Sequence, residues 1–381
     1  MRSFYDLIFF NVPHLRFPEF SGEWKKVRLG EICNMLCGYA FNGEDIVEQG
    51  SYLLMRGINI TEGSIRHSSE LDRYYSGSIE KLDKYKLAVG DLVIGMDGSK
   101  VGRNSAIVSS YEDGSYLVQR VCRIKSSIGN NYILQFINNT KFHQYVDTVK
   151  TSSAIPHISL GDIQNFRISI PPTQDETDKI AKLFLLLDER IATQNKIIER
   201  LETLIKGITQ NITLHNKPNV RISECLECTS STLQESDALR SGTYPVYGAN
   251  GIVGYLDNYS TQDEAVYIIK DGSGVGTVSY VTGQCSTTGT LNTLQAKEGY
   301  SLQYLYYILK VFNFEPYKTG MAIPHIYFKD YGKAKIFCPS YTKQLQYARL
   351  LSAIDGKVST EQNSLASLSL QKQYLLRQMF I

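Results

Sequence analysis

The residues of this sequence best suited to chemistry are aromatic, basic and hydroxyl side chains in predicted loops of its first half. Such side chains suit contacts with phosphate groups and with the edges of bases. Taken singly, each is better explained as part of a solvated surface with turn-forming serines. Together they predict a nucleic-acid-binding surface. The candidates are Tyr39, Phe41, Arg56, Asn59, Ser99, Lys100, Arg103, Ser152, Ser153 and His157.

The second half offers a similar but not identical set. Gly274 and Thr277 stand where the first half has Lys100 and Arg103. Because the charged side chains are absent there, we expect the two halves not to recognise the same surface of a ligand. The candidates in this half are Tyr247, Asn250, Lys270, Ser273, Thr319 and His325.

A short turn motif occurs in both halves, as DGSKVG at 97–102 and DGSGVG at 271–276. Its two glycines flank a small hydroxyl residue after a predicted buried strand. This pattern suits a tight turn whose backbone amides approach a phosphate. The motif is not a P-loop, because the chain contains no GK[ST] sequence.

Signatures of catalysis and of metal binding are missing from the sequence. It has no HExxH pair, no glycine-rich dinucleotide loop, and neither a methyltransferase tetrapeptide nor a nuclease carboxylate–lysine cluster. The Cys225-x2-Cys228 pair lacks the second half of a tetrahedral zinc site. We therefore expect a non-catalytic chain without a bound metal, whose seven cysteines are reduced and mostly buried.

Length and charge limit the possibilities further. A chain of 381 residues should hold two or more domains. Its net charge of +2 means that any DNA surface must come from local clustering of basic residues. No apolar run approaches the ~18 residues of a membrane span, and the opening MRSFYDLIFF lacks a cleavage-like continuation. We expect a cytoplasmic protein.

Two long stretches with heptad spacing must position these loops, at 173–212 and 343–379. One such stretch alone fits an amphipathic helix on a globular core equally well, but the second copy favours a coiled-coil seam. Gln194 and Glu361 are polar interruptions at equivalent positions of the two rows. The predicted seam consists of Phe184, Leu187, Ile191, Gln194, Ile198, Leu201, Ile205, Leu351, Ile354, Val358, Glu361, Leu365 and Leu368.

Further anchors recur in the same order, so the chain reads as two consecutive units. VRLGEIC at 27–33 resembles VRISECL at 220–226, and AIPHI occurs at 154–158 and 322–326. Strands are predicted at 91–94, 115–118, 265–269 and 277–281, and shorter helices at 131–150 and 301–312. We expect an α+β fold with a leader and first domain at 1–172, a central helix at 173–215, a second domain at 216–340 and a final helix at 341–381.

These features together resemble the specificity subunits of Type I restriction-modification systems. The resemblance covers nearly the whole chain. It is carried by the duplicated order of the anchors rather than by any single motif. Its carriers are WKKVRLGEI at 24–32, YPVYGANGIVGY at 244–255, both DGSxVG turns, both AIPHI segments, and the helices after Pro172 and Pro339.

The resemblance implies two similar target-recognition domains separated by two long helices that form an antiparallel coiled coil. Each domain would read one half of a bipartite, asymmetric target in double-stranded DNA. The helices would recruit two methyltransferase subunits, and restriction subunits with translocase and nuclease activity would join them. S-adenosylmethionine would belong to the methyltransferase partners, so this chain itself would need no cofactor.

Two departures and two alternatives remain at this stage. Trp24 has Lys217 at its equivalent position, and the second domain opens differently from the GYAF sequence at 38–41. The chain also fits an orphan or phase-variable specificity chain that serves another nuclease-methylase. An alternative of a different class is a two-domain scaffold that binds proteins or sugars, for which the modest net charge is the only support.

Overall fold

The computed structural model describes residues 11–320 and 323–381, which divide into two compact units. The first unit comprises the chain up to Thr193 together with Leu365–Ile381, and the second comprises Gln194–Ser364. Each long helix therefore contributes its two parts to different units. The predicted boundaries instead treated each helix as a segment of its own. The opening MRSFYDLIFF and Ala322 of the second AIPHI segment lie outside the described residues.

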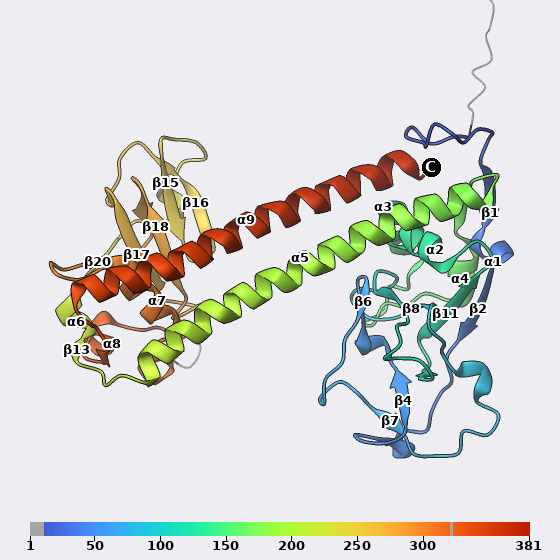
Figure 1. The fold of residues 1–381 in the computed structure, drawn as a ribbon, viewed down its shortest axis with the longest axis horizontal. Helices are drawn as coiled ribbons and strands as arrows, with labels where there is room; N and C mark the ends of the chain where they lie inside the picture. The colour runs from blue at the N-terminus through green and yellow to red at the C-terminus, as the bar shows by residue number, and fades with distance from the viewer. Residues whose placement is uncertain (1–10, 321–322) are drawn as a thin grey trace, which may run out of the picture. The chain divides into compact units, whose positions relative to one another are not determined.

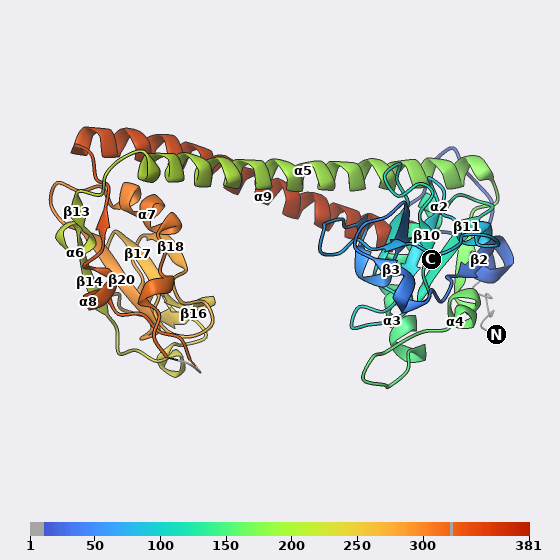
Figure 2. The same cartoon turned by 90° about the horizontal axis from the view of Figure 1, so that it is seen from below.

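The first unit is built on a four-stranded antiparallel sheet with a second, smaller sheet beyond it (Figures 1 and 2). The first sheet has the order β2 (Cys33–Cys37), β11 (Val121–Ser126), β8 (Leu92–Gly95), β9 (Ser105–Ile107). The second has the order β10 (Tyr116–Leu117), β4 (Tyr52–Met55), β7 (Tyr74–Tyr75), β3 (Ile46–Val47). The remaining strands and short helices are β1 (Lys25–Arg28) paired with β12 (Arg167–Ile170), β5 (Ile60–Thr61) paired with β6 (Ser64–Ile65), α1 (Leu29–Ile32), α2 (Asn130–Ile137), α3 (Thr140–Val149) and α4 (Leu160–Asn165).

The second unit repeats this arrangement. Its four-stranded sheet has the order β14 (Leu226–Ser230), β20 (Leu291–Ala296), β17 (Glu264–Ile269), β18 (Val278–Thr282). Its smaller sheet has the order β16 (Gly251–Leu256), β15 (Tyr244–Gly248), β19 (Ser286–Thr287). The remaining elements are β13 (Val220–Arg221) paired with β21 (Lys335–Ile336), α6 (Ile222–Cys225), α7 (Leu302–Val311) and α8 (Phe328–Tyr331).

The repeat in the sequence is therefore a repeat in topology. Each domain opens with a short strand that pairs antiparallel with the strand entering its long helix, β1 with β12 and β13 with β21. Each also contains one parallel pair in its smaller sheet, β10 with β4 and β15 with β19. The predicted α+β class, duplicated in two domains, is confirmed.

The helix predicted at 131–150 is in fact two helices, α2 and α3. The break falls at Asn138 and Asn139, and the Asn139 side chain accepts a hydrogen bond from the amide of Lys141 at the start of α3. An asparagine that caps a new helix in this way competes with continuation of the previous one. The helix predicted at 301–312 is confirmed as α7, whose first turn is capped by Ser301.

The two long helices are α5 (Gln174–Leu214) and α9 (Tyr341–Met379). At the start of α5 the hydroxyl of Thr173 accepts from the amide of Glu176 at 3.4 Å. The carboxylate of Glu176 is fully buried and accepts from Arg16 at 2.7 Å and from the indole of Trp24 at 3.3 Å. Trp24, singled out in the sequence because the second repeat has Lys217 instead, thus anchors the first turn of α5.

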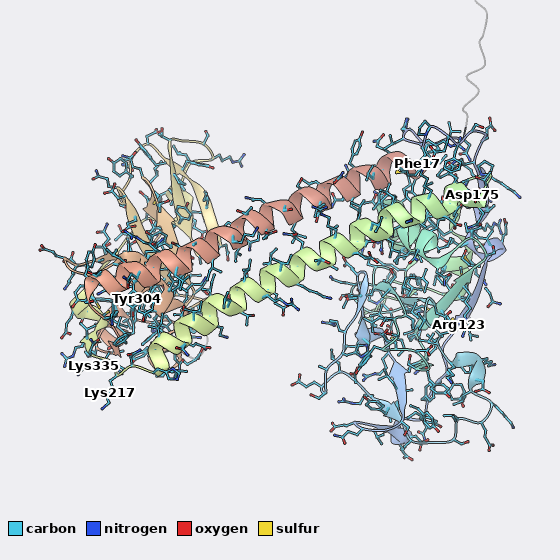
Figure 3. The ribbon with its side chains drawn as sticks, in the orientation of Figure 1. Phe17, Arg123, Asp175, Lys217, Tyr304 and Lys335 are labelled. Atoms are coloured by element: carbon cyan, nitrogen blue, oxygen red, sulfur yellow. The ribbon has the colours of Figure 1, made fainter. Side chains whose placement is uncertain are left out.

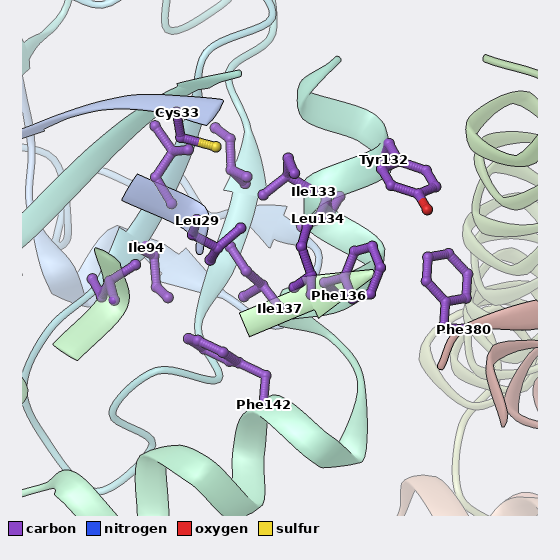
Figure 4. Packing of buried hydrophobic residues seen from close by; sticks show 14 of the residues in the cluster. Leu29, Cys33, Ile94, Tyr132, Ile133, Leu134, Phe136, Ile137, Phe142 and Phe380 are labelled. Carbon is purple, nitrogen blue, oxygen red and sulfur yellow. The ribbon is translucent and has the colours of Figure 1, made fainter. Parts of the chain in front are cut away.

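In the first unit, the later residues of α9 pack on the earlier residues of α5. Phe380 lies among aromatic rings from two helices. Its ring centroid is 5.6 Å from that of Tyr132 and 4.7 Å from that of Phe136 (Figure 4). It is 5.3 Å from the ring centroid of Phe184. Nearby, Asp188 of α5 accepts from Gln135 at 3.2 Å and pairs with Lys372 of α9. The two helices run antiparallel, and α9 completes a core that residues 24–184 begin.

In the second unit, the same two helices meet over a different core. Ile205 and Ile212 of α5 join Leu351 and Val358 of α9 against α7. Tyr304 of α7, labelled in Figure 3, is fully buried, and its hydroxyl donates to the carbonyl of Phe337 at 2.8 Å. Tyr307 bonds Asp355 at 3.3 Å, as Gln135 bonds Asp188 in the first unit.

The predicted seam positions are all buried or half-buried along both helices. By contrast, the apolar side chains of Leu186, Leu204 and Leu370 face solvent. Near the middle, the Gln194 amide donates to the main-chain carbonyl of Glu361 at 3.1 Å and also to its carboxylate. Hydrogen bonds from Lys357 and Gln194 lower the pKa of Glu361. The two polar interruptions therefore meet each other.

A separate feature of the first unit is a histidine held between two buried carboxylates. Nδ1 of His67 lies 3.0 Å from Asp72, and Nε2 lies 2.9 Å from Glu112. Burial raises the pKa of Glu112, but hydrogen bonds from Ser109 and His67 outweigh burial, so the net pKa is below its usual value. This cluster ties the segment around residue 67 to the loop around residue 112.

The polar contact at the seam should fix register at the expense of stability. We expect the Gln194→Leu, Glu361→Leu double variant to melt about 3 °C higher than the wild type and to lose its single register. Cysteines introduced at Leu201 and Ile354, each one heptad from the polar contact, report the register by crosslinking. Asn195→Leu with Gln362→Leu, which adds the same apolar groups at exposed positions, serves as the control. A lower melting temperature with one intact register would contradict the expectation.

The Glu112 cluster should make its loop sensitive to acid. A carboxyl whose folded pKa is lowered stabilises the fold above its unfolded pKa of about 4.3, and this stabilisation is lost as pH falls through the lower folded value. Protection of the amides at 109–115 against hydrogen exchange, corrected for the intrinsic exchange rate at each pH, should therefore fall below about pH 4.3 in the wild type. In Glu112→Gln this protection should be low at neutral pH already and change less with acid. Exposed Glu48→Gln should behave as the wild type; equal pH profiles for all three would exclude the cluster as the cause.

Candidate nucleic-acid interface

The DGSKVG turn follows β8 and packs directly on the first AIPHI segment. The amide of Gly98 donates to the carbonyl of Pro156 at 3.0 Å, and the amide of Ile158 donates to Met96 at 3.0 Å. Gly98 and Gly102 have φ values of +90° and +72°. A Cβ on Gly102 would also come within 2.8 Å of Val146, so this turn needs glycine for its backbone shape and for space.

The second domain builds the same contact. Gly272 donates to Pro324 at 3.0 Å, and Ile326 donates to the carbonyl of Lys270 at 2.9 Å. Gly276 has a φ of +90°, and a Cβ there would meet Phe314 at 3.1 Å. The two motifs that recur in the sequence are therefore partners in each domain. Because the Gly98 and Gly272 amides bind proline carbonyls, they do not serve as phosphate donors here.

The loop closed by this contact is held by a small polar cluster in the first domain. The hydroxyl of Thr151 lies 3.0 Å from Nδ1 of His157 and 3.0 Å from the hydroxyl of Ser153. Ser153 also donates to the carbonyl of Ile155 at 2.7 Å, while Ser152 is exposed. The side chains of His157 and Ser153 thus hold the loop in its shape and lie at its edge.

The basic candidates beside the turn are engaged in exposed ion pairs. Lys100 pairs with Glu62 at 3.0 Å, and Arg103 pairs with Asp147 at 2.9 Å. Hydrogen bonding from Lys150, together with the charge of Arg103, lowers the pKa of Asp147. Exposed pairs of this kind contribute little to stability, so breaking them to contact another anion costs little free energy. Lys100 and Arg103 are therefore free to turn toward a phosphate, and Ser99 beside them is exposed.

Two first-domain candidates have structural roles instead. Phe41 packs in a core with Leu54 and Tyr116, and Asn59 is 1% exposed. The Asn59 amide donates to Arg66 at 3.2 Å and to Asp72 at 3.1 Å. Their burial leaves neither side chain available to a ligand. Those two placements correct the prediction.

Tyr39 and Arg56 remain accessible. The Tyr39 ring is 39% exposed and lies 5.3 Å from the ring of Tyr85. Arg56 is half-buried, and its contact with the carbonyl of Leu71 is long, at 3.4 Å. An exposed tyrosine and a loosely held guanidinium suit stacking and phosphate contacts.

In the second domain, Tyr247 lines a pocket of about 410 Å³ between the two sheets. The pocket is also lined by Tyr267 and Thr277, the residue that replaces Arg103. Burial raises the pKa of Tyr247. Sequence spacing gave no sign of this pocket, because β15 and β17 belong to different sheets and only the topology brings them together.

The other second-domain candidates lie on loops. Asn250 is exposed in the turn between β15 and β16, and Ser273 is exposed in the DGSGVG turn. Thr319 and His325 face each other across the loop, with reciprocal backbone hydrogen bonds of 2.9 and 2.8 Å. Lys270 is half-buried after β17. This set is poorer in cations than the set around Lys100.

Within residues 11–320 and 323–381, no group of three or more His, Cys, Asp or Glu side chains is arranged to hold a metal. All seven cysteines are free, and five of them are buried. None of the described helices combines the length and apolar character needed to cross a membrane.

Comparison with known proteins assigns the two domains to a family. The family model described as the Type I restriction modification DNA specificity domain matches residues 21–203 and 217–370. The Type I restriction enzyme EcoAI specificity subunit of Escherichia coli is 29% identical over 184 residues, covering 47% of this chain and 30% of that protein. The EcoprrI specificity subunit of Escherichia coli is 28% identical over 134 residues, covering 35% of this chain and 32% of that protein. The chain thus spans about a third of the length of these relatives.

A solved structure extends the likeness to the whole fold. The crystal structure of the Type-I restriction-modification system S subunit from M. genitalium matches with a TM-score of 0.69 and 16% identity, covering 97% of this chain and 99% of that one. At this identity the match shows a shared fold. Since the family model covers both repeats and most of the sequence, the chain belongs to the family of Type I restriction-modification DNA specificity proteins.

Proposed function

We propose that this chain is the non-catalytic subunit that selects the DNA target of a cytoplasmic Type I restriction-modification complex. Each domain would read one half of a bipartite target. The observation that carries the proposal is the contact between the DGSxVG turn and the AIPHI loop, built twice with the same backbone hydrogen bonds. It supplies two similar platforms with different side chains, as two different half-sites require.

The asymmetry of the target follows from those side chains. Lys100 and Arg103 flank the first platform, whereas Gly274 and Thr277 occupy the same positions in the second. The first domain can therefore contact phosphates beside its turn, while the second offers small groups next to the pocket around Tyr247. In this proposal the side chains that contact bases differ between the domains as these positions do, which makes the target non-palindromic.

The long helices supply the surfaces for the other subunits in this proposal. Their apolar off-seam side chains, among them Leu185, Leu186 and Ile197 on α5 and Leu350 and Leu370 on α9, are exposed. Two methyltransferase subunits would dock on the helices, carrying S-adenosylmethionine and the catalytic residues. Restriction subunits would join that assembly. This chain would then contribute the choice of sequence and the spacing.

Replacing Lys100 and Arg103 by alanine should weaken DNA binding by the assembled methyltransferase complex about tenfold at moderate salt. The slope of log affinity against log salt should fall by about two units, because each lost phosphate contact removes nearly one. Binding titrations across a salt series measure both quantities. Lys25→Ala with Lys26→Ala removes the same charge from exposed positions of β1 and should leave the slope unchanged. An unaltered slope in the first variant would remove these two residues from the DNA face.

The length of the helix pair should set the length of the spacer between the half-sites, whose bases neither domain contacts. One heptad inserted after Thr193 and another after Thr360 keeps the seam in phase and adds about 10 Å, or nearly three base pairs. Methylation mapping of cells that express the variant complex should show unchanged half-sites with a longer spacer. Control insertions of three residues at the same places put the seam out of phase and should abolish methylation. An active heptad variant with the original spacer would refute this role.

A further inference from the structure

The two AIPHI loops share an exposed isoleucine that packing does not explain. Ile155 is 65% exposed and Ile323 is 67% exposed, although they occupy the same position of the repeat. The following isoleucines of the same motif, Ile158 and Ile326, are 2% and 1% exposed. Each loop thus buries one isoleucine and presents another.

These residues are also extreme within their domains. Among the described residues of 11–172, the other exposed large apolar side chains are Val12, Leu15, Tyr39, Ile58, Val89 and Tyr111, and among those of 216–340 they are Leu239, Ile252, Tyr259 and Tyr327. All ten are less exposed than the isoleucine of their domain. A single exposed apolar side chain is ordinary on a protein surface. In both domains the highest exposed fraction of these apolar side chains falls at the same position of the repeat, which indicates a common function.

The loops hold these isoleucines in place. The first is closed by the backbone contact of Thr151 with the carbonyl of His157 at 3.0 Å, and the second by Thr319 with His325 at 2.9 Å. Proline follows the isoleucine in both, and its carbonyl binds the glycine of the DGSxVG turn. A tip fixed by its own contacts loses little conformational entropy when it binds.

We propose that Ile155 and Ile323 are apolar wedges that enter DNA between adjacent base pairs, one in each half-site. This inference rests on the proposed function. Proteins that bend DNA insert Ile, Leu, Met, Phe or Pro between base steps and fill the gap left by partial unstacking. The first wedge is flanked by the small exposed serines Ser152 and Ser153, which allow close approach to the backbone. A protein partner would require a contiguous apolar patch, which Ile155 beside the hydroxyl groups of Ser152 and Ser153 does not provide.

The test uses the assembled methyltransferase complex and a duplex carrying the target found by methylation mapping. 2-Aminopurine, which fluoresces more strongly when unstacked, is placed at successive positions across both half-sites. The wild type should raise fluorescence at one step in each half-site. Ile155→Ala should abolish the rise in one half-site only and Ile323→Ala in the other, each with about tenfold weaker binding. Ile155→Met, which keeps an apolar tip, should retain the rise.

Val89→Ala and Ile252→Ala are the matched controls, because each truncates another exposed aliphatic side chain of the same domain. Both should keep the signal in both half-sites. Salt-dependent binding by the wild type without a rise at any step would overturn the wedge and leave the proposed function standing. The wedge would also be overturned if Ile155→Ala weakened DNA binding without changing the fluorescence, and if replacing one thymine with uracil weakened binding equally. That result would indicate a contact with a thymine methyl group instead. Failure of the wild-type complex to bind DNA would instead refute the proposed function.

Discussion

The fold depends on the need of two long helices to bury apolar rows along nearly their whole length. A single helix with the pattern of α5 would leave Phe184, Ile198 and Ile205 in water, at a cost of roughly 1.5–3 kcal/mol for each side chain. The second helix covers this row, and each domain covers what remains at its own part of the pair. The loops that carry the candidate DNA contacts are held by domains that are themselves fixed to α5 and α9.

The repeated turn shows how one backbone arrangement can carry two different sets of side chains. Its hydrogen bonds join main-chain atoms, so they do not depend on the residues at positions 100, 103, 274 and 277. Glycine is required where φ is positive or where Val146 and Phe314 approach, and the adjoining positions are free to vary. A platform built from backbone contacts therefore separates the residues that shape the loop from those that face a ligand.

Periodicity and repetition predicted the elements better than the individual contacts. The heptad rows predicted both long helices, and the repeated anchors predicted two domains of one topology. Four features were not predicted: the break at Asn139, where a local cap ends one helix and begins another, the burial of Phe41, the burial of Asn59, and the pocket beside Tyr247. Asn59 is fixed by Asp72, and Lys100 is paired with Glu62, a residue far from it in sequence. Contacts between distant loops leave no periodic trace, so the sequence could identify suitable side chains but not which of them face outward.

The position of Phe380 has a consequence for biosynthesis. Its ring fills the core begun by Tyr132, Phe136 and Phe184, yet it is made only after the entire second domain has been translated. Until then the nascent first domain exposes the apolar faces of α2 and α5, which are the kind of surface that chaperones bind. A chain that stopped after β21 would lack α9, so the cores of both domains would be incomplete. Closure of the first core is thus coupled to translation of residues 365–381.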